Sequence, residues 1–69
     1  MGDMKIRLNG DARELDCGYT IEGLLEIERL AERRVAVEVN GEIVPRGRHD
    51  THVLQDNDRV EIVHALGGG

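Results

Sequence analysis

Apolar and polar residues alternate in three short segments of this chain, most strictly in the first. Residues 4–8 (MKIRL) and 59–64 (RVEIVH) carry an apolar side chain at every second position, which is the period of a half-buried β-strand. Residues 35–39 (VAVEV) alternate in the same way and are rich in β-branched valine, which favours strands. The pattern therefore predicts three strands, one near each end of the chain and one in the middle.

Two Asn-Gly pairs, at residues 9–10 and 40–41, directly follow two of these segments. Both residue types tolerate a positive φ, so each pair predicts a two-residue hairpin turn. The first return strand is expected over residues 11–17, with Leu15 and Cys17 on one face. The second is expected over residues 42–44 and ends at Pro45, which cannot donate a hydrogen bond to a neighbouring strand and so indicates a sheet edge.

One amphipathic helix is predicted between the hairpins. Thr20 is a suitable N-cap, and the helix is expected over residues 21–31, closed by residues 32–34. The apolar positions that cover one helical side are Ile21, Leu24, Leu25, Ile27, Leu30 and Ala31. After the second hairpin, residues 46–50 are polar and predict a loop. Residues 51–54 predict a short extended piece, and residues 55–58 a polar turn stabilised by aspartate side chains.

The order hairpin, helix, hairpin, loop, strand predicts an α+β fold of the β-grasp (ubiquitin-like) type. We expect a mixed sheet of four to five strands with one main helix packed across one face. The last strand should lie centrally beside the first hairpin and parallel to one of its neighbours. Residues 1–64 are then one β-grasp domain, and residues 65–69 a flexible C-terminal tail.

Size and charge narrow the classes of function. The chain has 69 residues, of which 33% are charged, and its formal net charge is −5. One small domain leaves little room for a deep catalytic cleft, and the negative charge disfavours binding to nucleic acid or to an anionic membrane. No apolar run approaches a membrane span, no signal peptide is visible, and Cys17 is the single cysteine. These features favour the reducing cytoplasm.

The candidate reactive side chains do not form a catalytic set. Cys17 lies just before the predicted N-cap, where a thiolate is conceivable, but a buried apolar cysteine at a strand end is the preferred interpretation. His49 and His52 are three residues apart, yet their segment is loop-like and lacks a third ligand, so no metal site is predicted. His64 is expected to face solvent. We therefore do not expect enzyme activity from this chain alone.

The glycines at positions 67–69 are the strongest functional feature. Such a segment gains nothing from packing and is costly to order, but it can extend into a narrow channel and present its terminal carboxylate to another protein. Joined to AMP, that carboxylate becomes a mixed anhydride that nucleophiles attack readily. Ala65 and Leu66 would offer apolar surface to the partner protein. Val63 and Leu66 are the side chains expected to make apolar contacts with it.

Three segments together resemble the ThiS family, the sulfur carrier proteins of thiamin biosynthesis. They are residues 20–25 (TIEGLL), 37–46 (VEVNGEIVPR) and 54–63 (LQDNDRVEIV), followed by the glycine end. The run at 37–46 is the most specific part, since other families share Gly-Gly tails. Asn57 departs from the pattern, because a glycine is common there, but asparagine tolerates the same left-handed geometry.

The resemblance implies a chemistry for the tail. Gly69 would be adenylated by a ThiF-like enzyme that uses ATP and magnesium, and would then be converted to a thiocarboxylate. The sulfur would come from a cysteine desulfurase and be delivered at a ThiG-like thiazole synthase. Gly68 would be the required neighbour in the channel, and Gly67, Leu66 and Ala65 the docking stem. The chain itself would hold no stable cofactor and would be a monomer when free.

Three alternatives remain at the level of sequence. A MoaD-like small subunit of molybdopterin synthase uses the same tail chemistry, but those chains are usually somewhat longer. A ubiquitin-like protein modifier would join Gly69 to target lysines; Lys5 is the only lysine here, which argues against chain formation. A β-grasp interaction module with an inert tail is the third.

Overall fold

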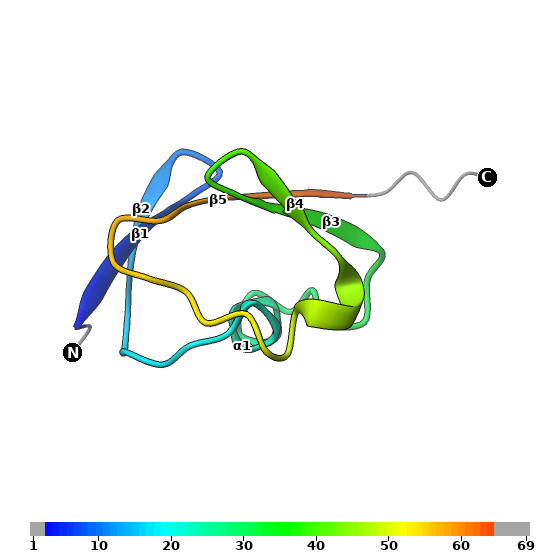
Figure 1. Cartoon of the computed structure of the whole chain (residues 1–69), viewed down its shortest axis with the longest axis horizontal. Coiled ribbons are helices and arrows are strands. Elements are labelled where there is room, and N and C mark those ends of the chain that lie inside the picture. The colour runs from blue at the N-terminus through cyan, green and yellow to red at the C-terminus, as the bar shows by residue number, and fades with distance from the viewer. Residues whose placement is uncertain (1–2, 65–69) are drawn as a thin grey trace.

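A five-stranded mixed sheet, covered on one face by a helix, makes up the described part of the chain (Figure 1). The computed structural model describes residues 3–64. Its strands are β1 (Met4–Leu8), β2 (Asp11–Leu15), β3 (Val35–Val39), β4 (Glu42–Val44) and β5 (Arg59–His64). Helix α1 (Ile21–Ile27) lies between β2 and β3, and one turn of 3-10 helix, η1 (Arg46–Arg48), follows β4. The predicted α+β architecture is confirmed.

The strand order is β2-β1-β5-β3-β4, so the last strand of the described chain occupies the centre of the sheet. β5 is parallel to β1 and antiparallel to β3, and both hairpins are antiparallel. The prediction that the final strand joins the first hairpin centrally and in parallel is confirmed. β4 is an edge strand, as its closure by Pro45 indicated.

An aliphatic core fills the space between the sheet and α1. The strand positions that alternate toward the helix are buried, and Ile6, Val37 and Val60 have 0–1% of their surface exposed. The buried core consists of Met4, Ile6, Leu8, Leu15, Ile21, Leu24, Leu25, Val37, Val39, Val44, Leu54, Val60 and Ile62. Alternation along the strands therefore predicted correctly which side of the sheet faces inward.

Helix α1 is shorter than predicted. Thr20 is its N-cap, as expected, and its hydroxyl accepts a hydrogen bond from the Gly23 N–H at 3.1 Å. The helix ends at Ile27, because Arg29 adopts a left-handed φ of 62° and the Leu30 N–H donates to the Leu25 carbonyl at 2.7 Å. This is the Schellman ending. Leu30 still packs against the core, but it does so from the turn after the helix.

The chain between β2 and α1 leaves the sheet earlier than predicted. Leu15 pairs with Met4, the first residue of β1, so the hairpin has no further partner for residues 16 and 17. Gly18 then turns the backbone with a φ of 96°, and Thr20 forms an isolated bridge with Val53. The predicted strand over residues 11–17 is therefore wrong in its last two residues.

The segment after β4 is more ordered than a polar loop. Residues 46–48 form η1, whose end is tied to the helix by the Glu22 N–H, which donates to the His49 carbonyl at 2.9 Å. The predicted extended piece is confirmed in part by the bridge of Val53 to Thr20. The Gln55 N–H donates to Asp58 Oδ2 at 2.8 Å, so the predicted aspartate-stabilised turn is confirmed.

Candidate functional site

The predicted reactive tail begins directly after β5. Gly69, its neighbours Gly68 and Gly67, and the stem residues Leu66 and Ala65 all lie outside the described residues, so their assignment stays a prediction. His64 is the last residue described. The structure therefore describes β5, the strand that precedes the candidate site, and not the site itself.

β5 is paired with β3 along its full length past Arg59. The antiparallel register runs from Val39 opposite Val60 to Val35 opposite His64. The pairing with β1 on the other side is shorter and ends at Leu8 opposite Val60. Beyond that point the side chain of Asn9 replaces β1 as the partner of β5, since its Oδ1 accepts a hydrogen bond from the Ile62 N–H at 2.8 Å.

Asn40, in the second hairpin turn, fixes the start of β5. Its Oδ1 accepts a hydrogen bond from the Arg59 N–H at 2.9 Å, and its Nδ2 donates to Asp58 Oδ1 at 2.9 Å. Asp58 is buried, with 7% of its surface exposed. The two Asn-Gly turns thus also anchor the central strand, one from each side. Sequence reasoning identified the turns but missed this second role of the asparagine side chains.

The surface next to the end of β5 includes apolar side chains. Val63 is 54% exposed, and its partner across β3 is Ala36. Ile43, on the edge strand β4, is 68% exposed. Val63 is therefore accessible for the apolar contact predicted from the sequence, and whether a partner uses it stays a prediction. His64 is exposed, which confirms its predicted solvent-facing position.

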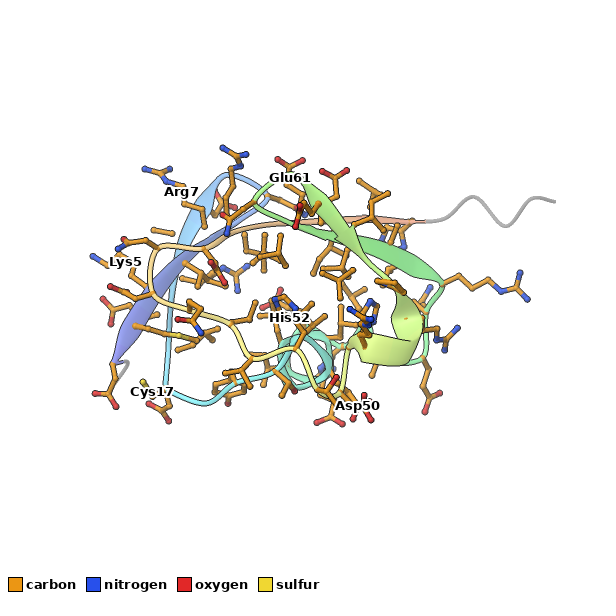
Figure 2. All side chains as sticks on the ribbon, viewed as in Figure 1. Lys5, Arg7, Cys17, Asp50, His52 and Glu61 are labelled. Carbon is orange, nitrogen blue, oxygen red and sulfur yellow. The ribbon has the colours of Figure 1, made fainter. Side chains whose placement is uncertain are left out.

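Cys17 is not buried, contrary to the preferred sequence interpretation. It is exposed as a free cysteine, since the chain has already left the sheet at Leu15 and turns at Gly18. Figure 2 shows it at the end of the molecule opposite the carboxyl end of β5. Cys17 therefore lies far from the point at which the tail departs.

The histidine pair is not a metal site. His49 is buried, and its Nε2 lies 3.0 Å from the Val44 carbonyl oxygen, so this nitrogen donates a hydrogen bond to the backbone. His52 lies further along the loop, beside the helix layer (Figure 2). Among residues 3–64, no group of three or more histidine, cysteine, aspartate or glutamate side chains is placed to hold a metal ion. Within the same residues, no helix is long and apolar enough to cross a membrane.

Comparison with known proteins points to one family. The model of the ThiS family matches residues 6–69, a range that includes the glycine tail. The sulfur carrier protein ThiS of Bacillus subtilis is 42% identical over 65 residues, which cover 93% of this chain and 98% of that protein. A thiazole synthase of Magnetococcus marinus is 47% identical over 66 residues, which cover 96% of this chain but only 20% of that protein.

The fold comparison agrees with the sequence comparison. The crystal structure of the thiamine biosynthesis protein ThiS from Geobacter metallireducens superposes with a TM-score of 0.82 at 32% sequence identity. The match covers 96% of this chain and 100% of that one. Since the family match spans nearly the whole chain and the β-grasp fold is shared, the chain belongs to the ThiS family.

Proposed function

We propose that this chain is a sulfur carrier that supplies the sulfur of the thiazole moiety of thiamin, and that the α-carboxylate of Gly69 is the group that carries it. The observation behind this proposal is the family match, which runs through residue 69 and therefore includes all three glycines. The relative from Bacillus subtilis, which matches over 98% of its own length, is named a sulfur carrier protein.

The proposed chemistry takes place at one carbon atom. The Gly69 carboxylate attacks the α-phosphorus of magnesium-bound ATP in a ThiF-like enzyme, and pyrophosphate leaves. A sulfur nucleophile, supplied from a cysteine desulfurase as a persulfide, then displaces AMP from the acyl adenylate. Reductive cleavage of the acyl disulfide by a thiol leaves a thiocarboxylate, whose sulfur is more nucleophilic than a carboxylate oxygen. Glycine suits this position because it has no side chain to obstruct the adenylate pocket.

A thiazole synthase is the proposed acceptor of the sulfur. In the relative from Magnetococcus marinus, the part similar to this chain makes up a fifth of a protein named thiazole synthase. Two activities joined in one protein often act in sequence, so this arrangement supports a ThiG-like partner. The carrier would act in the cytoplasm as a monomer between its encounters with these enzymes.

The described residues suit a carrier better than an enzyme. Among residues 3–64, no histidine or cysteine side chain is hydrogen-bonded to a carboxylate, and His49 Nε2 donates to the Val44 carbonyl oxygen. The proposed function assigns catalysis to the partners, because the matched relative from Bacillus subtilis is named a sulfur carrier protein. The role of the domain is to hold β5 firmly and to present the residues that follow it.

Intact mass spectrometry tests this function directly. The chain is incubated with a ThiF-like enzyme, magnesium, ATP, a cysteine desulfurase, cysteine and a thiol reductant. We expect a mass increase equal to the exchange of one oxygen for sulfur, and the same treatment of a variant that lacks Gly69 should leave the mass unchanged. A wild-type chain that is never shifted under these conditions would contradict the proposal.

Two further measurements separate the proposal from its alternatives. Capture of a ThiG-like rather than a MoaE-like partner distinguishes a thiamin carrier from a molybdopterin synthase subunit. A ladder of conjugates on a denaturing gel of cell extract would indicate a protein modifier instead. A β-grasp module with an inert tail would give neither a mass shift nor a ladder.

A further inference from the structure

A small cavity lies at the end of the domain where β5 finishes. It has a volume of about 130 Å³ and is lined by residues from α1, from the turn after it, from the start of β3 and from the segment around η1. Val35, one of these residues, is the direct partner of His64 in the sheet. Figure 1 shows η1 and the start of β3 at the same end of the molecule as the carboxyl end of β5. The cavity is therefore next to the base of the proposed tail.

Two arginines on the cavity wall have no carboxylate partner within the described residues. Arg33 and Arg46 both line the cavity and are exposed. The one ion pair within residues 3–64 joins Arg13 to Glu28, so Glu22, which also lines the cavity, is not paired with either guanidinium. An arginine that is exposed beside a concave surface and lacks an internal partner is available to an external anion.

The positive charge around the cavity stands out against an acidic chain. Arg34 directly follows Arg33, Arg48 lies two residues after Arg46, and both are exposed, so four arginines lie on two short segments. Glu32 and Asp50 flank these segments, which leaves the arginines in excess. The whole chain nevertheless has a formal net charge of −5. We call Arg33, Arg34, Arg46 and Arg48 the arginine surface. Its charge is opposite to that of the chain as a whole, which would orient an approaching acidic partner.

The backbone beneath these arginines is well supported. The Arg48 N–H donates to the Pro45 carbonyl at 2.8 Å, and the Arg33 N–H donates to the Leu30 carbonyl at 3.0 Å. The buried His49, which also lines the cavity, joins η1 to β4 through its bond to the Val44 carbonyl. The arginine side chains thus start from fixed turns, which reduces the entropy lost when they bind.

We propose that the arginine surface is a docking surface for acidic side chains of the enzyme that adenylates Gly69. The inference rests on the proposed function, because an enzyme that takes the tail must approach the end of β5 and therefore faces these residues. The cavity is large enough for the end of a carboxylate side chain, and a guanidinium pairs with a carboxylate through two parallel hydrogen bonds. Among possible occupants, partner carboxylates satisfy both the charge and the position.

The test compares two double variants with the same change in charge. Arg33→Gln with Arg46→Gln alters the arginine surface. Arg7→Gln with Arg59→Gln is the control, since this exposed pair lies opposite each other on β1 and β5, at the start of β5. The rate of ATP–pyrophosphate exchange by the adenylating enzyme is measured against carrier concentration at low and high salt.

We expect the arginine-surface variant to raise KM about tenfold at about 50 mM salt, with kcat unchanged, and the difference to shrink at about 500 mM salt because charge interactions are screened. An equal rise in the control would show a bulk charge effect and overturn the docking surface, as would no rise in either variant. The absence of exchange with the wild-type chain would instead refute the proposed function, and this inference with it.

Discussion

Replacing Asn40 with glycine removes two side-chain hydrogen bonds and keeps the backbone conformation. Asn40 has a φ of 53°, which glycine adopts without steric cost. The substitution deletes the bond from Nδ2 to Asp58 and the bond from the Arg59 N–H to Oδ1, both 2.9 Å long. Its effect therefore reports how much the asparagine side chain contributes to holding the start of β5.

The expected loss follows from the two partners. A neutral hydrogen bond contributes about 1 kcal/mol net, and a bond to a carboxylate about 1.5–3 kcal/mol. Asp58 is buried, so the oxygen that loses its donor cannot be fully solvated. Glycine removes the steric strain of a positive φ, which stabilises the fold by about 1 kcal/mol. It also makes the unfolded chain more flexible, which destabilises the fold by about the same amount, so the two effects cancel. We therefore expect the free energy of unfolding to fall by about 2.5–4 kcal/mol.

Asn57→Gly is the matched control. Asn57 also has a left-handed φ, of 73°, but its side chain makes only a 3.3 Å contact with the neighbouring Asp56 in an exposed turn. The chemical change and the backbone region are the same, while no bond to β5 is lost. We expect its free energy of unfolding to stay within about 0.5 kcal/mol of the wild type.

Urea unfolding followed by far-ultraviolet circular dichroism measures both variants. In thermal unfolding followed by the same signal, the melting temperature of the Asn40 variant should lie about 10–30 °C below that of the control, for a chain of this size. Amide hydrogen exchange supplies a local measurement, since the Arg59 N–H should lose protection in the Asn40 variant. If the two variants have the same stability, the side chain of Asn40 does not anchor β5 and the reasoning is wrong.

Four further substitutions test the local structure by the same unfolding assay. Arg29→Gly should raise stability by about 0.5–1 kcal/mol, because Arg29 holds a left-handed φ of 62° in an exposed position; a loss would contradict the Schellman ending. Leu24→Ala should cost about 2–5 kcal/mol and Ile27→Ala less than about 1.5 kcal/mol, since their exposed fractions are 0% and 50%; similar costs would place Ile27 back in the core. Cys17→Ser should change stability by less than about 0.5 kcal/mol, and a large loss would indicate that the thiol is buried.

The strands and turns could be predicted because each depends on local chemistry. Alternation assigned the buried faces of β1, β3 and β5, and both Asn-Gly pairs adopt the positive φ values that their residue types favour. The N-cap at Thr20 has the same local origin. The central position of β5, parallel to β1, is the arrangement expected of the β-grasp plan that the order of the elements indicated.

The features that the sequence did not predict depend on contacts between distant residues. The apolar spacing continues through Leu30 and predicts a longer helix. The helix ends because Arg29 adopts a positive φ, and no glycine in the sequence indicated that ending. Cys17 fitted the alternation of β2, but β1 begins at Met4 and offers no partner past Leu15. His49 looked like part of a polar loop, and its burial depends on a carbonyl of β4.

The contacts around β5 explain how so short a chain can hold its last described strand firmly in the sheet. β3 pairs with it up to His64, β1 pairs with its start, and Asn9 extends the second side as far as Ile62. Val60 and Ile62 face the core, so removing β5 would expose the centre of the molecule and separate the two hairpins. Local opening of this strand therefore costs nearly as much as global unfolding. Under the proposed function, an enzyme that binds the residues after His64 would act on the element whose separation from the domain is least favourable, so its binding free energy would not be spent on opening the sheet.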